Sequence, residues 1–226
     1  MPQEAHVTHQ SKSLVALVAV VGLAASSLFA QDAGDAGRDK FEKVADILAA
    51  LEVATASRVA DVGAGDGFYS VRIARAMPPG GRVTAVDVTE KALEQLRQRL
   101  EREKVTNVDS VLGAFDSPRL PADTFDAVLI YNAYHEMTEY GAMLKGILSG
   151  LRAGGRLVIV ERIDDSLRAQ GRAEQTAKHQ LSDDFTALEL EAAGFTIVRK
   201  DPTFRPFTVS TGNGTWWLIV AGKPTQ

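Results

Sequence analysis

The stretch Val59–Ser70 reads VADVGAGDGFYS, and it decides the fold. An apolar run carries one acid, Asp61, and then breaks into three glycines that are separated by single residues. Residues from Phe68 onward have helical spacing. A strand, a glycine turn and a helix N-terminus in this order form a cradle for a nucleoside-bearing cofactor. We therefore expect such a cofactor to bind at this turn.

The third glycine distinguishes between cofactors. The dinucleotide fingerprint G-x-G-x-x-G would follow Gly63 and Gly65 with a glycine at position 68, but the third glycine is Gly67. Asp66 lies in the turn and would repel a pyrophosphate placed at the helix N-terminus. An NAD-type oxidoreductase is therefore the less favoured alternative.

Acidic residues follow several predicted strands. Asp61 lies in the first strand, Asp87 ends the second, Asp116 follows the third and Glu161 ends the fifth. Asp87 lies 22 residues beyond Gly65, the distance at which an acid meets ribose hydroxyls in nucleotide-binding βαβ units. Because ligands bind at the carboxyl ends of parallel strands, this series suits a ligand with ribose hydroxyls, an adenine amine and a cation.

The sequence D-x-G-x-G-x-G at 61–67 resembles the first motif of the class I S-adenosylmethionine (SAM) dependent methyltransferases. GAFDSPRLPADTF at 113–125 and LRAGGRL at 151–157 resemble two later motifs of that family, and the resemblance covers about residues 40–200. It implies SAM as cofactor and methyl transfer to a small molecule. The positions it implies for SAM are Asp61, Gly63, Gly65 and Gly67 for the methionine part, Asp87 for the ribose, Val88 for the adenine ring, and Asp116 with Ser117 for the adenine amine. Asn132, at the end of the fourth predicted strand, is a further cofactor-binding candidate because of its position.

Strand and helix patterns alternate along the chain, which favours parallel βαβ units. The expected fold is α/β, a doubly wound, mostly parallel seven-stranded sheet with helices on both faces and an antiparallel last strand. We expect residues 162–178, which are polar and lack periodicity, to form a mobile insert beside the ligand edge. The predicted strands are 58–62, 82–86, 108–112, 125–131, 156–160, 195–200 and 215–221, and the predicted helices are 39–52, 68–77, 89–103, 140–151 and 182–194.

Three polar residues after the fourth and fifth strands are the catalytic candidates. His135 is the first choice for a base or for orienting the substrate, while Glu136 and Glu161 could orient an amine or balance a sulfonium. Two placements are open for His179, beside Lys178: it faces the site from the polar insert or, as favoured, the two form a solvated surface pair. These residues belong to three separate loops without a short metal-binding spacing, so no metal is predicted.

The composition and charge of the chain indicate which kinds of binding partner to expect. The chain has 226 residues, no cysteine and a net charge of −4. No basic stripe is present, so nucleic acid is not the expected partner. Residues 14–30 are uncharged, follow Lys12 and end in small residues, in the order of a secretory signal peptide. We expect residues 1–30 to be a signal peptide, or an uncleaved anchor that contacts the membrane, 31–38 a linker and 39–226 the methyltransferase domain.

Export suggests a further alternative. SAM is made and used in the cytosol, so an exported chain with this scaffold could be a catalytically silent SAM-binding or structural protein. Methyl transfer by the exported or anchored domain remains the leading hypothesis.

Overall fold

The computed structural model describes residues 35, 37–53, 57–209 and 212–225. The chain divides into two units, residues 1–44 and 45–226, and the second contains the entire sheet. The predicted segment 1–30 and most of the predicted linker lie outside the described residues. Among the helices that are described, none has both the length and the hydropathy that crossing a bilayer requires.

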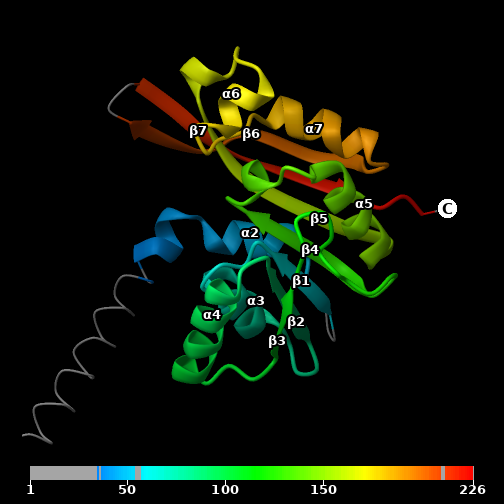
Figure 1. Ribbon diagram of the computed structural model, residues 1–226. Coiled ribbons are helices and arrows are strands. Elements are labelled where there is room, and N and C mark those ends of the chain that lie inside the picture. The colour runs from blue at the N-terminus through cyan, green and yellow to red at the C-terminus, as the bar shows by residue number, and fades with distance from the viewer. Residues whose placement is uncertain (1–34, 36, 54–56, 210–211, 226) are drawn as a thin grey trace, which may run out of the picture. The chain divides into compact units, whose positions relative to one another are not determined.

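Seven strands form one sheet in the order β3-β2-β1-β4-β5-β7-β6, and β7 runs antiparallel to both of its neighbours (Figure 1). The chain order reverses at β1, which pairs with β2 on one side and β4 on the other. The predicted doubly wound sheet with an antiparallel last strand is confirmed. The strands are β1 (Arg58–Val62), β2 (Arg82–Asp87), β3 (Val108–Leu112), β4 (Phe125–Tyr131), β5 (Leu151–Asp164), β6 (Thr196–Val209) and β7 (Gly212–Gly222).

Helices α3 and α4 pack near β1–β3, whereas α5 and α7 pack near β5–β7 (Figure 1). Thr89 caps α4 by accepting a hydrogen bond from Ala92 N, and Ser182 caps α7 by accepting one from Phe185 N. The helices are α2 (Val44–Ala50), α3 (Phe68–Ala76), α4 (Glu90–Glu103), α5 (Tyr140–Gly150), α6 (Arg172–Thr176) and α7 (Asp183–Ala192), with short 3₁₀ turns η1 (Tyr134–Glu136) and η2 (Asp165–Leu167).

The core lies between the central strands and these helices. Consecutive residues in the middle of β4 and β5 are fully buried, and alternate ones cluster with the apolar face of α5 and with Trp217 of β7. Trp217 also donates its indole N–H to Leu181 O, 2.8 Å away. This close packing holds the carboxyl ends of β1, β2, β4 and β5 in one row, which is where the site forms.

Five predicted segments differ from the structure. Strands β5, β6 and β7 are longer than expected, because β5 and β6 continue along β7 beyond the end of the parallel sheet. The predicted helix at 39–52 is interrupted by a turn at Glu42 and Lys43, where Lys43 has a φ of 51°. The predicted insert 162–178 contains the end of β5, η2 and α6 rather than an irregular loop.

Candidate functional site

The glycine turn between β1 and α3 has the predicted shape. All three glycines have positive φ, 78° at Gly63, 55° at Gly65 and 82° at Gly67, which L side chains rarely adopt. A Cβ on Gly63 would lie 2.5 Å from the Cβ of Ala133, whereas a Cβ on Gly65 would meet nothing within 4 Å. Gly63 is therefore required by packing, and Gly65 leaves open space through which a ligand can approach the backbone.

Asp87 ties the second strand to this turn. Its Oδ2 accepts a hydrogen bond from Gly65 N at 3.0 Å. Its Oδ1 accepts from the backbone N–H and the hydroxyl of Thr89, each at 3.0 Å. These bonds fix the carboxylate at the end of β2, where the sequence predicts a ribose contact.

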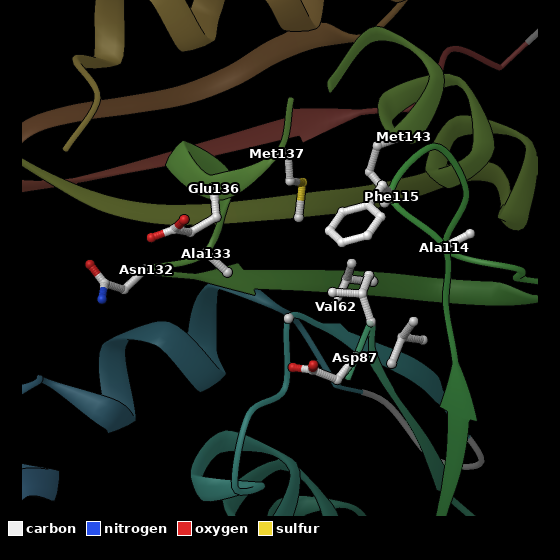
Figure 2. A pocket seen from close by; sticks show the side chains of 12 residues that line it. Val62, Asp87, Ala114, Phe115, Asn132, Ala133, Glu136, Met137 and Met143 are labelled. Atoms are coloured by element: carbon white, nitrogen blue, oxygen red, sulfur yellow. The ribbon is translucent and has the colours of Figure 1, made fainter. Parts of the chain in front are cut away.

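A cavity of about 320 Å³ opens at the reversal point of the sheet. Figure 2 shows the carboxylates of Asp87 and Glu136 and the amide of Asn132 toward one side, with Phe115 and Met143 toward the other. One wall thus offers hydrogen-bonding groups and the other an apolar surface, as a nucleoside requires. The lining residues are Val62, Gly63, Val86, Asp87, Val88, Ala114, Phe115, Asn132, Ala133, Glu136, Met137 and Met143.

Some predicted cofactor residues lie outside this lining. Asp116 is exposed on the turn after Phe115, and the hydroxyl of Ser117 accepts from Arg119 N. Asp61 is buried and accepts a 2.6 Å hydrogen bond from the Ser70 hydroxyl. Their assignments to the cofactor stay predictions.

Asp61 is buried, where a negative charge is poorly solvated. Burial is the main cause that raises the pKa of Asp61 to about 6, and the nearby carboxylates of Asp87 and Asp66 raise it further against the hydrogen bonds from Ser70. A buried carboxyl with a perturbed pKa beside a cavity is a feature of functional sites.

Asp66 has a local structural role. Its Oδ1 accepts from Phe68 N at 3.3 Å and its Oδ2 accepts from the buried Arg99 at 2.7 Å. The carboxylate thus occupies the N-terminus of α3. This is the place where a dinucleotide-binding site holds a pyrophosphate, so the arrangement weighs against an NAD-type ligand.

A fully buried carboxylate, Glu161, organises the opposite end of the cavity. Glu161 Oε1 accepts hydrogen bonds from the backbone N–H groups of Tyr134, at 2.7 Å, and His135, at 3.2 Å. Both carboxylate oxygens lie within 3.0 Å of His135 Nδ1. Because a carboxylate only accepts, His135 Nδ1 carries the proton.

The contacts continue from His135 toward solvent. His135 Nε2 lies 3.1 Å from Glu136 Oε1, and the same oxygen lies 2.6 Å from His179 Nδ1. Burial lowers the pKa of His135, but the hydrogen bond and charge of Glu161 outweigh it and leave the pKa above its ordinary value. The hydrogen bond from His179 is the main cause that holds the pKa of Glu136 below its ordinary value.

The structure brings all three catalytic candidates together and adds His179, which the sequence assigned to the surface. Their separation along the chain is the reason that no metal is predicted, but the fold brings them together. The insert turns back onto the end of β5, where Leu181 N donates to Arg162 O and Gln180 pairs with Asp164. His135, Glu136 and His179 consequently present possible ligand atoms within 4.8 Å of one another.

Phe115, Met137 and Met143 line the cavity but are not among the predicted site residues. Phe115 is 68% exposed although it is aromatic, and Met137 and Met143 lie on opposite sides of the turn that follows η1. Phe115 lies next to the predicted Asp116, and this position is the feature of the sequence that points to Phe115 as a site residue. The methionines are indistinguishable from core residues in the sequence.

The comparisons with known proteins agree with this geometry. Residues 59–155 match a family model described as a methyltransferase domain. The ubiquinone/menaquinone biosynthesis C-methyltransferase UbiE of Pseudomonas putida is 30% identical over 110 residues, which cover 48% of this chain and 43% of that protein. A demethylmenaquinone methyltransferase of Geobacillus is 25% identical over 122 residues, which cover 54% of this chain and 52% of that protein. The chain therefore spans only about half the length of these relatives.

Solved structures show the same fold. A SAM-dependent methyltransferase from Aquifex aeolicus has a TM-score of 0.67 at 21% identity, covering 82% of this chain and 92% of that one. A geranyl diphosphate methyltransferase in complex with GPP and sinefungin has a TM-score of 0.66 at 15% identity, covering 80% of this chain and 77% of that one. The expected fold is confirmed. Residues 59–155 are similar to a methyltransferase domain, and the chain shares the fold of SAM-dependent methyltransferases.

Proposed function

We propose that this chain binds SAM in the cavity at the reversal point of the sheet and transfers its methyl group to a small-molecule acceptor. The observation that carries the proposal is the link between Gly65 N and the carboxylate of Asp87, which joins the two strand ends that face the cavity. The open space beside Gly65 and the apolar surface of Val88 and Phe115 fit a nucleoside.

SAM, when bound, supplies a sulfonium methyl group for an in-line displacement by the acceptor. The contribution of this chain is chiefly to position the two reactants. The oxygens of Asp87 are already oriented by backbone N–H groups, so they are ready to accept from hydroxyl groups without reorganisation.

The acceptor end is marked by Glu136 and Met137, which line the cavity immediately after β4. Glu136 offers a charged group and connects to His135, whereas Met137 offers apolar contact. This pairing suits a small acceptor with an apolar body and a polar or ionisable head. The relatives named for ubiquinone and menaquinone biosynthesis support a small molecule of this kind.

Isothermal titration calorimetry with SAM and S-adenosylhomocysteine tests the cofactor assignment. We expect one site per chain for each ligand and no heat with NADH. Folded protein that binds neither nucleoside would disprove the proposal. Binding of NADH without binding of SAM would instead support the oxidoreductase alternative.

Release of S-adenosylhomocysteine in the presence of small-molecule acceptors tests the enzymatic step. Hydroquinones and phenols are the first acceptors to try, given the names of the relatives. Turnover with any of them would exclude the catalytically silent alternative. SAM binding without turnover across amine, phenol and carbon acceptors would favour it.

We also propose that residues 1–30 direct the chain out of the cytosol or anchor it at the membrane. The support comes from the sequence order of Lys12, the uncharged run at 14–30 and its small residues. Mass spectrometry of the chain from separated cell fractions would give its N-terminus and compartment. Full-length protein confined to the cytosol would contradict this proposal.

A further inference from the structure

We propose that His135, Glu136 and His179 form a binding site for a divalent transition metal at the edge of the cavity. The ligand atoms are His135 Nε2, a carboxylate oxygen of Glu136 and His179 Nδ1, all within 4.8 Å of one another. Two imidazoles with one carboxylate are a donor set suited to Zn²⁺, Fe²⁺, Co²⁺ or Mn²⁺.

The spacing of these atoms is close to that of ligands around one ion. Ligands about 2.1 Å from a metal, at angles between 90° and 109°, lie roughly 3.0–3.4 Å from each other. His135 Nε2 and Glu136 Oε1 are 3.1 Å apart, and His179 Nδ1 is 2.6 Å from the same oxygen. Glu136 and His179 are both exposed, so their side chains can shift to bring the three atoms, now within 4.8 Å of one another, to that spacing.

Glu161 prepares His135 to act as a ligand. A metal-binding histidine usually donates its second ring N–H to a carboxylate, which fixes the tautomer and the ring orientation. His135 Nδ1 donates to Glu161, so in the neutral ring the lone pair lies on Nε2 and faces Glu136. Glu161 is itself fully buried and held by the backbone N–H groups of Tyr134 and His135. A purely surface ion pair would not need this buried support.

His179 is also held in place. Gln180, the next residue, donates to Asp164 Oδ2 and accepts from Asp164 N, which fixes the chain beside the end of β5. The histidine has a φ of 54°, a backbone conformation that costs about 1 kcal/mol for a residue other than glycine. Its ring lies edge-on to that of His135, with the ring centres 5.9 Å apart. The donor set is thus assembled by the fold rather than by neighbouring positions in the sequence.

The metal would act on the methyl acceptor. Three protein ligands leave coordination positions open, as in catalytic rather than structural metal sites. Glu136 also lines the cavity, so an ion bound to it lies where an oxygen of the acceptor can coordinate. Coordination would lower the pKa of a hydroxyl group and hold its oxygen toward the methyl donor. This last role rests on the proposed methyl transfer, whereas metal binding does not.

Titration with Co²⁺ and Zn²⁺ of untagged, chelator-treated protein tests the site. A background variant H6A/H9A removes the two other histidines of the chain, which lie outside the described residues. We expect one Co²⁺ per chain by calorimetry, with a dissociation constant on the order of 10 µM or tighter. Visible absorption bands of bound Co²⁺ should show nitrogen and oxygen ligands.

Variants of the exposed ligands separate this site from adventitious binding. E136Q and H179A should weaken Co²⁺ binding about 100-fold, and E161Q, which acts through His135, about 10- to 100-fold. E139Q and K178A change neighbouring exposed side chains and should bind Co²⁺ like the background protein. Because E136Q and H179A alter exposed side chains, we expect both to fold, which circular dichroism and urea unfolding of each variant check.

Two results would overturn the metal site. One is the absence of stoichiometric binding of either ion by folded background protein. The other is binding that E136Q and H179A leave unchanged. If SAM binds but metal does not, only the metal site is wrong. If metal binds but SAM does not, only the proposed function is wrong.

Discussion

The two ends of the cavity are built in different ways. At the proposed cofactor end, Gly63, Gly65 and Asp87 lie within 25 residues of each other. Gly65 N donates to the Asp87 carboxylate, and Gly63 N donates to Val86 O. At the proposed acceptor end, Glu136, Glu161 and His179 span 43 residues of the chain, and side chains make most of the contacts. A local motif therefore specifies the first end, whereas the second depends on how the insert folds back. We expect substitutions at one end to leave the other functional.

The largest effect is expected for Glu161→Ala. The substitution leaves the N–H groups of Tyr134 and His135 without their buried acceptor, which should lower the free energy of unfolding by about 4 kcal/mol. Urea unfolding measures this loss. Glu161→Gln keeps an acceptor oxygen and is the matched control, with a smaller loss. SAM affinity within about threefold of wild type would show that the two ends are independent.

Asp61 should make stability depend on pH. Its raised pKa, about 6 against an ordinary value near 3.8, means that the folded state holds the proton more tightly than the unfolded state. Wild-type stability should therefore fall, by about 3 kcal/mol in total, as the pH rises from 4 to above 6. Asp61→Asn lacks this titrating carboxyl group, so its stability relative to wild type should rise over the same pH range.

Urea unfolding of both proteins without SAM, from pH 4.5 to 8, measures the difference. A stability difference that does not change with pH would show that Asp61 is not responsible. If the carboxylate serves the methionine part of SAM, Asp61→Asn should also weaken SAM binding above pH 6 while stabilising the free protein.

Gly63→Ala should abolish most cofactor binding. The new Cβ would lie 2.5 Å from Ala133 Cβ in a backbone conformation unfavourable for alanine, so the turn must move. We expect SAM affinity to fall about 100-fold, which is about 2.7 kcal/mol. Gly80→Ala is the matched control, because Gly80 has a φ of 92° but open space around it. Equal losses of SAM affinity in both variants would assign the effect to general instability.

The smallest effect is expected for Asp87→Asn. One oxygen still accepts a hydrogen bond, but the new amide cannot accept from the N–H groups of both Gly65 and Thr89. SAM affinity should fall about tenfold, or about 1.4 kcal/mol, with Co²⁺ binding unchanged. Asp109→Asn, on the exposed edge strand, is the control. An unchanged SAM affinity would exclude Asp87 from the cofactor site.

Most of the parallel sheet could be predicted from the sequence. Strands β1, β3 and β4 have the predicted bounds, because their apolar runs end at clear polar or glycine breaks. The ends of β5, β6 and β7 could not be predicted, since pairing between antiparallel strands extends them through polar residues such as Arg162 and Asp164. A strand that is stabilised by a partner distant in sequence carries little local signal.

The sequence by itself determined the cofactor end: the glycine spacing at 63–67 and the acid at Asp87 lie within one βαβ unit, whose geometry is local and recurrent. Only the tertiary structure decided the acceptor end. The place of His179 depends on the return of the insert to β5, through the contacts of Gln180 with Asp164 and of Leu181 with Arg162. The polar residues of the insert have no periodicity that predicts its return to β5. The free energy that holds them comes from contacts across the fold rather than from neighbours along the chain.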